Sequence, residues 1–154
     1  MIACIKFSDI FIVIKGERDI INSITFSKEK ITENYSDDSE VAKARLQLLK
    51  YLNKELIEFD LKLNLQGSNF KLCAYNGMMS IPYGNTLSYK QLAKLINNPN
   101  GSRAIGNACN KNEFIIVVPC HRILKSDGGL GGYAPGLKYK KLLLELENNG
   151  GYYG

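Results

Sequence analysis

Residues 114–122 read Phe-Ile-Ile-Val-Val-Pro-Cys-His-Arg, a change within nine residues from uninterrupted apolar to reactive side chains. The run 114–118 is short and mostly β-branched, which predicts a fully buried strand. Pro119 has no backbone N–H to donate, so we expect it to end that strand. Cys120 is therefore expected at the end of a buried element, next to His121, the one histidine of the chain.

A cysteine followed by a histidine is a candidate nucleophile, because a neighbouring base or positive charge raises the thiolate fraction. His121 could take the thiol proton through a bridging water, and Arg122 would add positive potential. A catalytic imidazole also needs an orienting group, for which Glu145 and Glu147 on the last predicted helix are candidates. Spacing alone does not choose between them, and an unreactive buried cysteine beside a surface histidine is the alternative.

Two short helices are predicted before this stretch. Residues 88–91, Ser-Tyr-Lys-Gln, have capping-box spacing and are followed by apolar residues at helical intervals. After a turn at residues 97–101, Ser102 can cap a second helix over residues 103–110. By pattern alone an ordinary αα-hairpin fits better than a helix-turn-helix, because the turn is slightly long for that motif.

A polar break at residues 66–69 indicates a domain boundary, which predicts domains over residues 1–66 and 67–154. The first expected domain combines strands and one helix, over residues 2–7, 10–15, 20–26, 40–53 and 61–65. Besides the two short helices, the second expected domain has a helix over residues 70–79, a glycine-rich loop over 128–136 and a last helix over 137–148.

The net charge of +5 is unevenly distributed along the 154 residues. Residues 1–66 carry ten basic and eleven acidic side chains, whereas residues 67–154 carry ten basic and four acidic ones. A basic half suggests a polyanion partner such as nucleic acid, and it shifts the helix pair towards a DNA-contacting motif. From charge alone, a positively charged solvated surface is an equal alternative.

The four cysteines contain no Cys-x-x-Cys pair, and a single histidine excludes a multi-histidine metal site. No apolar stretch is long enough for a membrane span, and the N-terminus does not resemble a secretion signal. We therefore expect reduced thiols in the cytoplasm. Cys4 and Cys73 are expected to be buried structural residues, and Cys109 is left without a predicted role.

The motifs of the second half resemble those of one family, the O6-alkylguanine-DNA alkyltransferases or methylated-DNA–protein-cysteine methyltransferases. The resemblance covers residues 59–147, and its order and spacing are maintained without gaps from Tyr89 onward. The matching motifs are Ile81-Pro-Tyr-Gly84, Ser88-Tyr89-x-x-Leu-Ala93, Arg103-Ala-Ile-Gly106, Asn112, Ile116-Val-Val-Pro-Cys-His-Arg122 and Gly129-Leu-Gly-Gly-Tyr133. It implies an α+β fold, with a small N-terminal α/β domain of the ribonuclease H-like type and a mostly helical C-terminal domain containing a winged helix-turn-helix.

The resemblance also implies roles for single residues. Cys120 looks like the alkyl acceptor, His121 like the base that deprotonates it through a water, and Glu147 like the carboxylate that orients His121. Asn112 is similar to the asparagine that links the recognition helix to the active site. Tyr89 is similar to the tyrosine whose hydroxyl interacts with the guanine ring during transfer. The implied DNA-binding residues are Arg103, which enters the base stack, Ser102, Ala104, Asn107 and Lys111, and the implied pocket residues are Tyr133, Gly131, Gly132, Ala134 and Pro119.

By this resemblance, the protein is expected to transfer one alkyl group from O6-alkylguanine, or from O4-alkylthymine, to Cys120 after base flipping. The expected partner is double-stranded DNA containing O6-alkylguanine, bound by a cytoplasmic monomer that needs no cofactor, metal or membrane. Two alternatives stay open. One is a non-catalytic DNA-binding relative, against which Cys120 and His121 argue, and the other is a thiol hydrolase that turns over.

Overall fold

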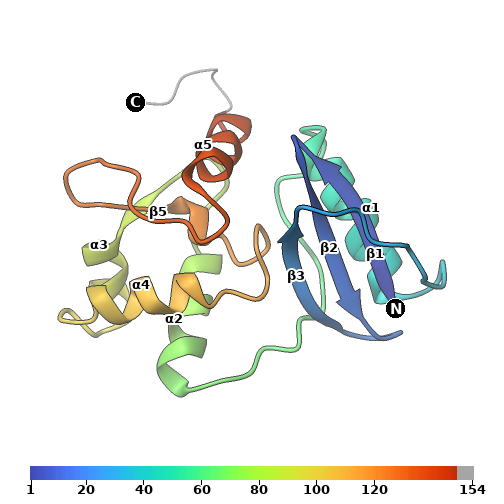
Figure 1. Cartoon of the computed structure of the whole chain (residues 1–154). Helices are drawn as coiled ribbons and strands as arrows, with labels where there is room; N and C mark the ends of the chain where they lie inside the picture. Colours follow the sequence, from blue (N-terminus) through green and yellow to red (C-terminus); the bar gives the residue numbers. More distant parts are fainter. Residues whose placement is uncertain (149–154) are drawn as a thin grey trace. The chain divides into compact units, whose positions relative to one another are not determined.

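The computed structural model describes residues 1–148 of the chain, and its first strands form an antiparallel sheet in chain order (Figure 1). Phe7 lies opposite Ile10, so Ser8 and Asp9 make the first turn. Ser8 has a φ of 56°, the left-handed conformation that tight hairpin turns use. The strands, which confirm the three predicted ones, are β1 (Ile2–Phe7), β2 (Ile10–Gly16) and β3 (Ile21–Ser27).

Helix α1 (Glu40–Leu52) packs against β1 and β2 through a regular apolar stripe. The hydroxyl of Ser39 caps the helix by accepting the N–H of Ala42 at 3.1 Å. Each fully buried side chain of valine or leucine size contributes roughly 1.5–3 kcal/mol, so this stripe stabilises the helix on the sheet. The buried residues recur at the spacing of one helix face and are Val41, Ala44, Leu48 and Tyr51.

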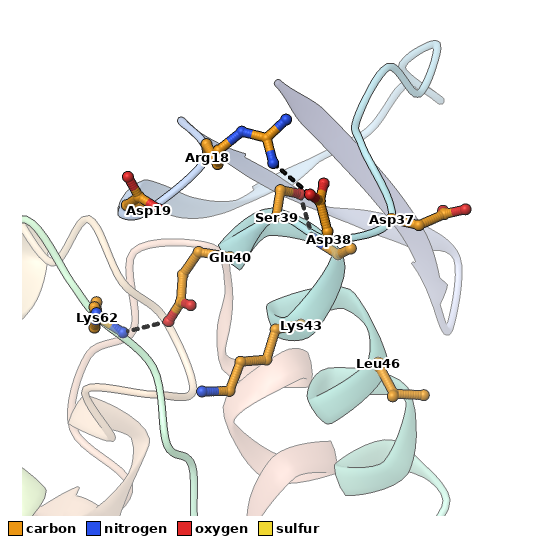
Figure 2. Close-up of a pocket in the computed structure, with 10 residues that line it drawn as sticks. Arg18, Asp19, Asp37, Asp38, Ser39, Glu40, Lys43, Leu46 and Lys62 are labelled. Carbon is orange, nitrogen blue, oxygen red and sulfur yellow. Dashed lines mark hydrogen bonds and ion pairs between the residues drawn. The ribbon is translucent and has the colours of Figure 1, made fainter.

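An open pocket beside the first turn of α1 is lined by charged residues of both signs (Figure 2). Arg18 pairs with Asp38, and the carboxylate of Glu40 accepts the backbone N–H of Lys62 at 2.7 Å. The side chains of Arg18 and Asp38 are 57% and 70% exposed, so their pair contributes at most about 1 kcal/mol. The contact of Glu40 fixes the segment that returns from α1 towards the sheet.

The second part of the chain contains short strands and most of the helices. Strands β4 (Leu87–Ser88) and β5 (Ile123–Leu124) pair in parallel, which brings the start of α3 (Tyr89–Leu95) beside the residues that follow a 3₁₀ turn, η1 (Cys120–Arg122). The predicted capping box is confirmed, since Ser88 Oγ accepts the Gln91 N–H at 3.0 Å and Gln91 Oε1 accepts the Ser88 N–H at 2.8 Å. The elements are α2 (Asn69–Met79), β4 (Leu87–Ser88), α3 (Tyr89–Leu95), α4 (Ser102–Asn110), η1 (Cys120–Arg122), β5 (Ile123–Leu124) and α5 (Leu137–Leu146).

The apolar run 114–118 is not the buried strand that the sequence predicts. Ile116 has a φ of 72°, which interrupts an extended conformation and is unusual for a β-branched residue. Among the described residues, the run contributes one isolated bridge, between Phe114 and Ile24. The backbone N–H of Ile24 donates to the backbone oxygen of Glu113 at 2.7 Å. The segment therefore contacts the edge of β3 and then turns away from it.

The chain forms one small α+β protein, and the predicted pair of an N-terminal α/β domain and a mostly helical domain with a winged helix-turn-helix is wrong. Residues 1–148 contain five α-helices and two small sheets, of three and two strands. By their contacts, residues 1–65 group with Glu113–Ile115, and residues 66–112 group with those from Ile116 onward. The chain therefore does not divide at one point, because the segment after α4 returns to β3 before reaching Cys120.

The structure also differs from the sequence predictions in a strand, a cysteine and the end of a helix. The strand predicted over residues 61–65 is reduced to an isolated bridge between Leu63 and Ile21. Cys73 is exposed on α2 rather than buried, whereas Cys4 is buried as expected. Helix α5 ends at Leu146, two residues earlier than predicted. No helix among residues 1–148 has both the length and the hydrophobicity that a membrane crossing requires.

Candidate active site

Cys120 is the first residue of η1 and is buried, with 4% of its surface exposed. The side-chain amide of Asn112 holds it in place, since Nδ2 donates to the backbone oxygen of Val118 at 2.8 Å and lies 3.2 Å from Cys120 Sγ. The backbone N–H of Asn112 donates to the oxygen of Cys109 at 3.2 Å. The end of α4 is thus tied directly to the thiol.

His121 and Glu147 form a buried pair next to this cysteine. His121 Nε2 lies 2.7 Å from Glu147 Oε2, and the two side chains are 0% and 1% exposed. Glu147 is the C-cap residue of α5, whereas Glu145 is exposed on the same helix. Of the two carboxylates that the sequence offers, the structure therefore brings Glu147 to the histidine.

Arg122 binds the same carboxylate rather than adding its charge to the thiol. Its Nε lies 2.8 Å from Glu147 Oε1 and its Nη2 lies 2.9 Å from Oε2, a bidentate pair. Its Nη1 donates to the backbone oxygen of Ile81 at 2.7 Å. The guanidinium therefore compensates Glu147 and fixes the carboxylate that faces His121.

Burial sets the direction of the pKa shift for Cys120 and His121, but not for Glu147. It raises the pKa of the Cys120 thiol, against the hydrogen bond from Asn112 and the charge of Lys140. It lowers the pKa of His121, although Glu147 acts in the opposite direction. Burial would raise the pKa of Glu147 as well, but the hydrogen bonds and charges of His121 and Arg122 prevail and lower it to about 2. The resting site therefore holds a thiol, a neutral imidazole and a carboxylate.

The hydrogen bond to Glu147 decides which nitrogen of His121 can act as a base. Because Nε2 faces a carboxylate, we assign the ring proton to Nε2 and the lone pair to Nδ1. His121 Nδ1 is buried and has no hydrogen-bond partner within residues 1–148. Nδ1 is therefore free to accept a proton, as a general base requires.

Tyr89 begins α3 and approaches both α4 and the glycine-rich loop. A Cβ atom on Gly131 would lie 3.1 Å from the Tyr89 hydroxyl, and one on Gly106 would lie 4.0 Å from the ring. Gly131 also has a φ of 72°, so this close approach requires glycine. Burial raises the pKa of Tyr89, so its hydroxyl stays protonated and can donate a hydrogen bond.

The other predicted pocket residues lie on both sides of the thiol. Pro119 is buried directly before Cys120, while Gly132 and Ala134 are exposed in the loop. A Cβ atom on Gly132 would meet nothing within 4 Å. The hydroxyl of Tyr133 is buried, and burial, followed by the effects of Cys120 and Cys109, raises its pKa. The loop therefore combines a buried phenol with an exposed edge.

Helix α4 carries the residues that the resemblance assigns to DNA contact. Ile105 and Ala108 are its buried residues, and Ser102 is partly exposed. The predicted DNA-binding residues that are exposed are Arg103, Ala104, Asn107 and Lys111, the last being the C-cap residue.

Two buried cations in this region were not predicted by the sequence in their observed roles. Arg122 was expected near the thiol, and Lys140 was not singled out. A signal for Lys140 exists, because it precedes the buried Leu143, Leu144 and Glu147 by three, four and seven residues, the spacing of one helix face.

Comparison with known proteins identifies the family. The family model described as "6-O-methylguanine DNA methyltransferase, DNA binding domain" matches residues 69–149. The methylated-DNA–protein-cysteine methyltransferase of Methanosarcina acetivorans is 38% identical over 143 residues, which are 90% of this chain and 92% of that protein. A crystal structure of Mycobacterium tuberculosis OGT in complex with DNA has a TM-score of 0.82 and 33% identity, covering 94% of this chain and 91% of that one. The resemblance in the motifs is thereby confirmed, and the chain belongs to the family of O6-methylguanine-DNA methyltransferases.

Proposed function

We propose that this protein repairs alkylated DNA by direct reversal, with Cys120 as the final acceptor of the alkyl group. Alkyl transfer to a cysteine is the reaction of the family to which the chain belongs. The observation that supports Cys120 as the acceptor is the set of polar side chains around it. Its sulfur lies 3.2 Å from the amide nitrogen of Asn112, and the next residue belongs to a buried histidine–glutamate pair with a 2.7 Å contact.

In the proposed reaction, His121 Nδ1 takes the Cys120 proton through a water, and the thiolate attacks the alkyl carbon on guanine O6. The S–C bond forms as the C–O6 bond breaks, and the electron pair of the broken bond stays on the guanine. Tyr89 donates a hydrogen bond to the ring, which stabilises the developing negative charge. Glu147 stabilises the imidazolium of His121, whose proton is then available to neutralise the guanine.

The product of this reaction explains why each molecule would act once. The alkylated sulfur of Cys120 is a thioether, which is not displaced by water or imidazole at neutral pH. The thiolate is itself the acceptor, so the proposed reaction uses no cofactor. O4-alkylthymine offers the same alkyl–oxygen bond, and we include it as a second substrate.

The alkylated oxygen lies inside a paired duplex, so the nucleotide must be flipped out at a cost of a few kcal/mol. We place the flipped base in the pocket formed by Pro119, Tyr89 and the loop of Gly131, Gly132, Tyr133 and Ala134. A Cβ atom on Gly132 would meet nothing within 4 Å, which leaves space for a base beside it, whereas the space beside Gly131 is filled by Tyr89.

We place the DNA on the exposed face of α4, with Arg103 entering the space that the flipped nucleotide leaves. Helix α4 would lie in the minor groove, which distinguishes base pairs poorly and therefore suits repair without sequence preference. The proposed partner is duplex DNA containing O6-alkylguanine, bound by one copy of the chain. The four free cysteines fit a reducing compartment such as the cytoplasm.

Intact mass spectrometry after incubation with duplex DNA containing O6-methylguanine tests the proposal. We expect one methyl group per protein molecule, located on the Cys120 peptide, with an end point that further DNA does not increase. The same duplex with unmodified guanine is the control. An unchanged mass would indicate a non-catalytic DNA-binding protein, and product beyond one equivalent would indicate a hydrolase.

Replacing Arg103 with alanine is expected to slow transfer from duplex DNA by about tenfold or more, the effect of losing one specific contact. Transfer from free O6-benzylguanine should be unchanged, because no nucleotide has to leave a base stack. Second-order rate constants for both substrates measure the difference. Lys50→Ala, which removes an exposed charge from α1, is the matched control. Equal losses on both substrates would contradict the role of Arg103.

A further inference from the structure

Lys140 is a fully buried lysine on α5 whose partners are backbone oxygens. It is 0% exposed, and its Nζ donates to the oxygen of Ile123 at 2.6 Å and to that of Gly132 at 3.2 Å. Within residues 1–148, no carboxylate forms an ion pair with it. A buried ammonium is costly unless its charge is compensated, so carbonyl oxygens alone do not account for this residue.

The two oxygens that Lys140 contacts belong to the two sides of the proposed pocket. Ile123 directly follows η1, and its backbone N–H donates to the oxygen of Cys120. Gly132 belongs to the loop that we assign to the flipped base. One ammonium therefore joins the end of the active-site turn to the base-binding loop.

Among the cations near Cys120 in residues 1–148, Lys140 is the one without an anionic partner. Arg122 is paired with Glu147, and His121 is neutral because burial lowers its pKa. Lys140 Nζ contacts the oxygen of Ile123, whose own N–H donates to the oxygen of Cys120, so the ammonium lies at the same turn as the thiol. Burial lowers the pKa of Lys140, while Cys109 and Cys120 act to raise it. Within the described chain, the titratable groups whose charges act on Cys120 are Tyr89 on α3, Cys109 on α4, Tyr133 on the loop and Lys140 on α5. His121 and Arg122 follow Cys120 on η1, and both contact Glu147 at the end of α5.

We propose that Lys140 is a positioning residue for alkyl transfer, which joins the base-binding loop to the active-site turn and compensates the charge of the Cys120 thiolate. Its ammonium gains an anionic partner when His121 removes the thiol proton and loses it when the sulfur becomes a neutral thioether. Its stabilising effect is therefore greatest in the reactive state, as catalysis requires. This inference rests on the proposed function for the nature of the reaction, but the stabilised thiolate can be measured without DNA.

The rate at which iodoacetamide alkylates Cys120, measured against pH by peptide mass spectrometry, tests the charge effect. Lys140→Met removes the charge and the donors, whereas Lys140→Gln removes the charge and keeps an amide donor. We expect both variants to shift the profile to higher pH and to slow the reaction about tenfold at neutral pH. Lys141→Met, which changes the exposed neighbour, should leave the profile where it is.

Two neutral variants are used because the pH profile of Lys140→Gln can still be compared with that of the wild type if Lys140→Met does not fold. Thermal unfolding identifies the folded variants. A profile that keeps its midpoint, with an equal loss of rate at every pH, would overturn the proposal and leave Lys140 a purely structural role. Methyl transfer from O6-methylguanine DNA, measured on the same wild-type preparation, separates the two ideas. A shifted profile without transfer rejects the proposed function alone, and transfer without a shifted profile rejects the role of Lys140 alone.

Discussion

Replacing Cys120 with alanine is expected to abolish methyl uptake from O6-methylguanine DNA, because the variant has no sulfur to accept the group. DNA binding should persist, since the exposed face of α4 is unchanged. Intact mass measures the uptake, and a fluorescent duplex measures the binding. Cys73→Ala is the matched control, because it removes a thiol that is exposed on α2, and it should take up one methyl group as the wild type does.

The fold should tolerate the loss of Cys120. The side chain is small, and the amide of Asn112 keeps its hydrogen bond to Val118, so we expect a cost of about 1–2 kcal/mol in the free energy of unfolding. Methyl uptake by a folded Cys120→Ala protein would contradict the assignment of the acceptor and would direct attention to Cys109.

Replacing Glu147 with glutamine is expected to reduce both activity and stability. The amide orients His121 poorly and cannot balance an imidazolium, so the rate of transfer should fall by about 10²–10⁴-fold. Arg122 is left as an uncompensated buried charge, which should lower the free energy of unfolding by about 3–5 kcal/mol. Single-turnover kinetics and urea unfolding measure the two effects. Glu145→Gln, an exposed change on the same helix, should alter neither.

The same carboxylate predicts how stability depends on pH. Glu147 has a pKa of about 2 in the folded protein against an ordinary value of 4.5. Its contribution to the free energy of unfolding is therefore fully present above pH 4.5 and is lost as the pH falls towards 2. His121 acts in the same direction, because its lowered pKa lets the unfolded chain bind a proton first as pH falls through 6.5. Urea unfolding at several pH values should show a smaller acid loss in Glu147→Gln. An equally steep loss in that variant would contradict the low pKa.

Some local signals in the sequence predicted the local structure, but Ser102 does not cap α4 as expected: it is the first residue of the helix, and Gly101 at the N-cap offers no side-chain hydrogen bond. Ser88 and Gln91 lie three residues apart and need only each other to form a capping box, and Ser39 needs only the first turn of α1. The run 114–118 was misassigned for a physical reason. Its apolar, β-branched residues predict burial correctly, but burial does not require an extended chain, and the left-handed φ of Ile116 has no counterpart in the pattern.

The candidate site was predictable where its residues are adjacent or carried by the family motif. Cys120 and His121 follow one another, and the resemblance pointed to Glu147, which the structure places 2.7 Å from His121. The cations were harder to predict, because the sequence shows a charge and not the partner that it meets. Arg122 contacts a carboxylate that lies 25 residues away in the sequence. Lys140 contacts two backbone oxygens, and because every residue has one, the sequence does not indicate which of them it meets.

The exposure of Cys73 on α2 has a practical consequence for handling this protein. Its thiol faces solvent while Cys4 and Cys120 are buried, so reagents that count accessible sulfhydryls will register Cys73 first. A drop in that count would report intermolecular oxidation during storage rather than consumption of the repair thiol. For the same reason, Cys73 offers an attachment point for a fluorophore or a solid support, and its replacement by alanine gives a cleaner background for titrations of Cys120.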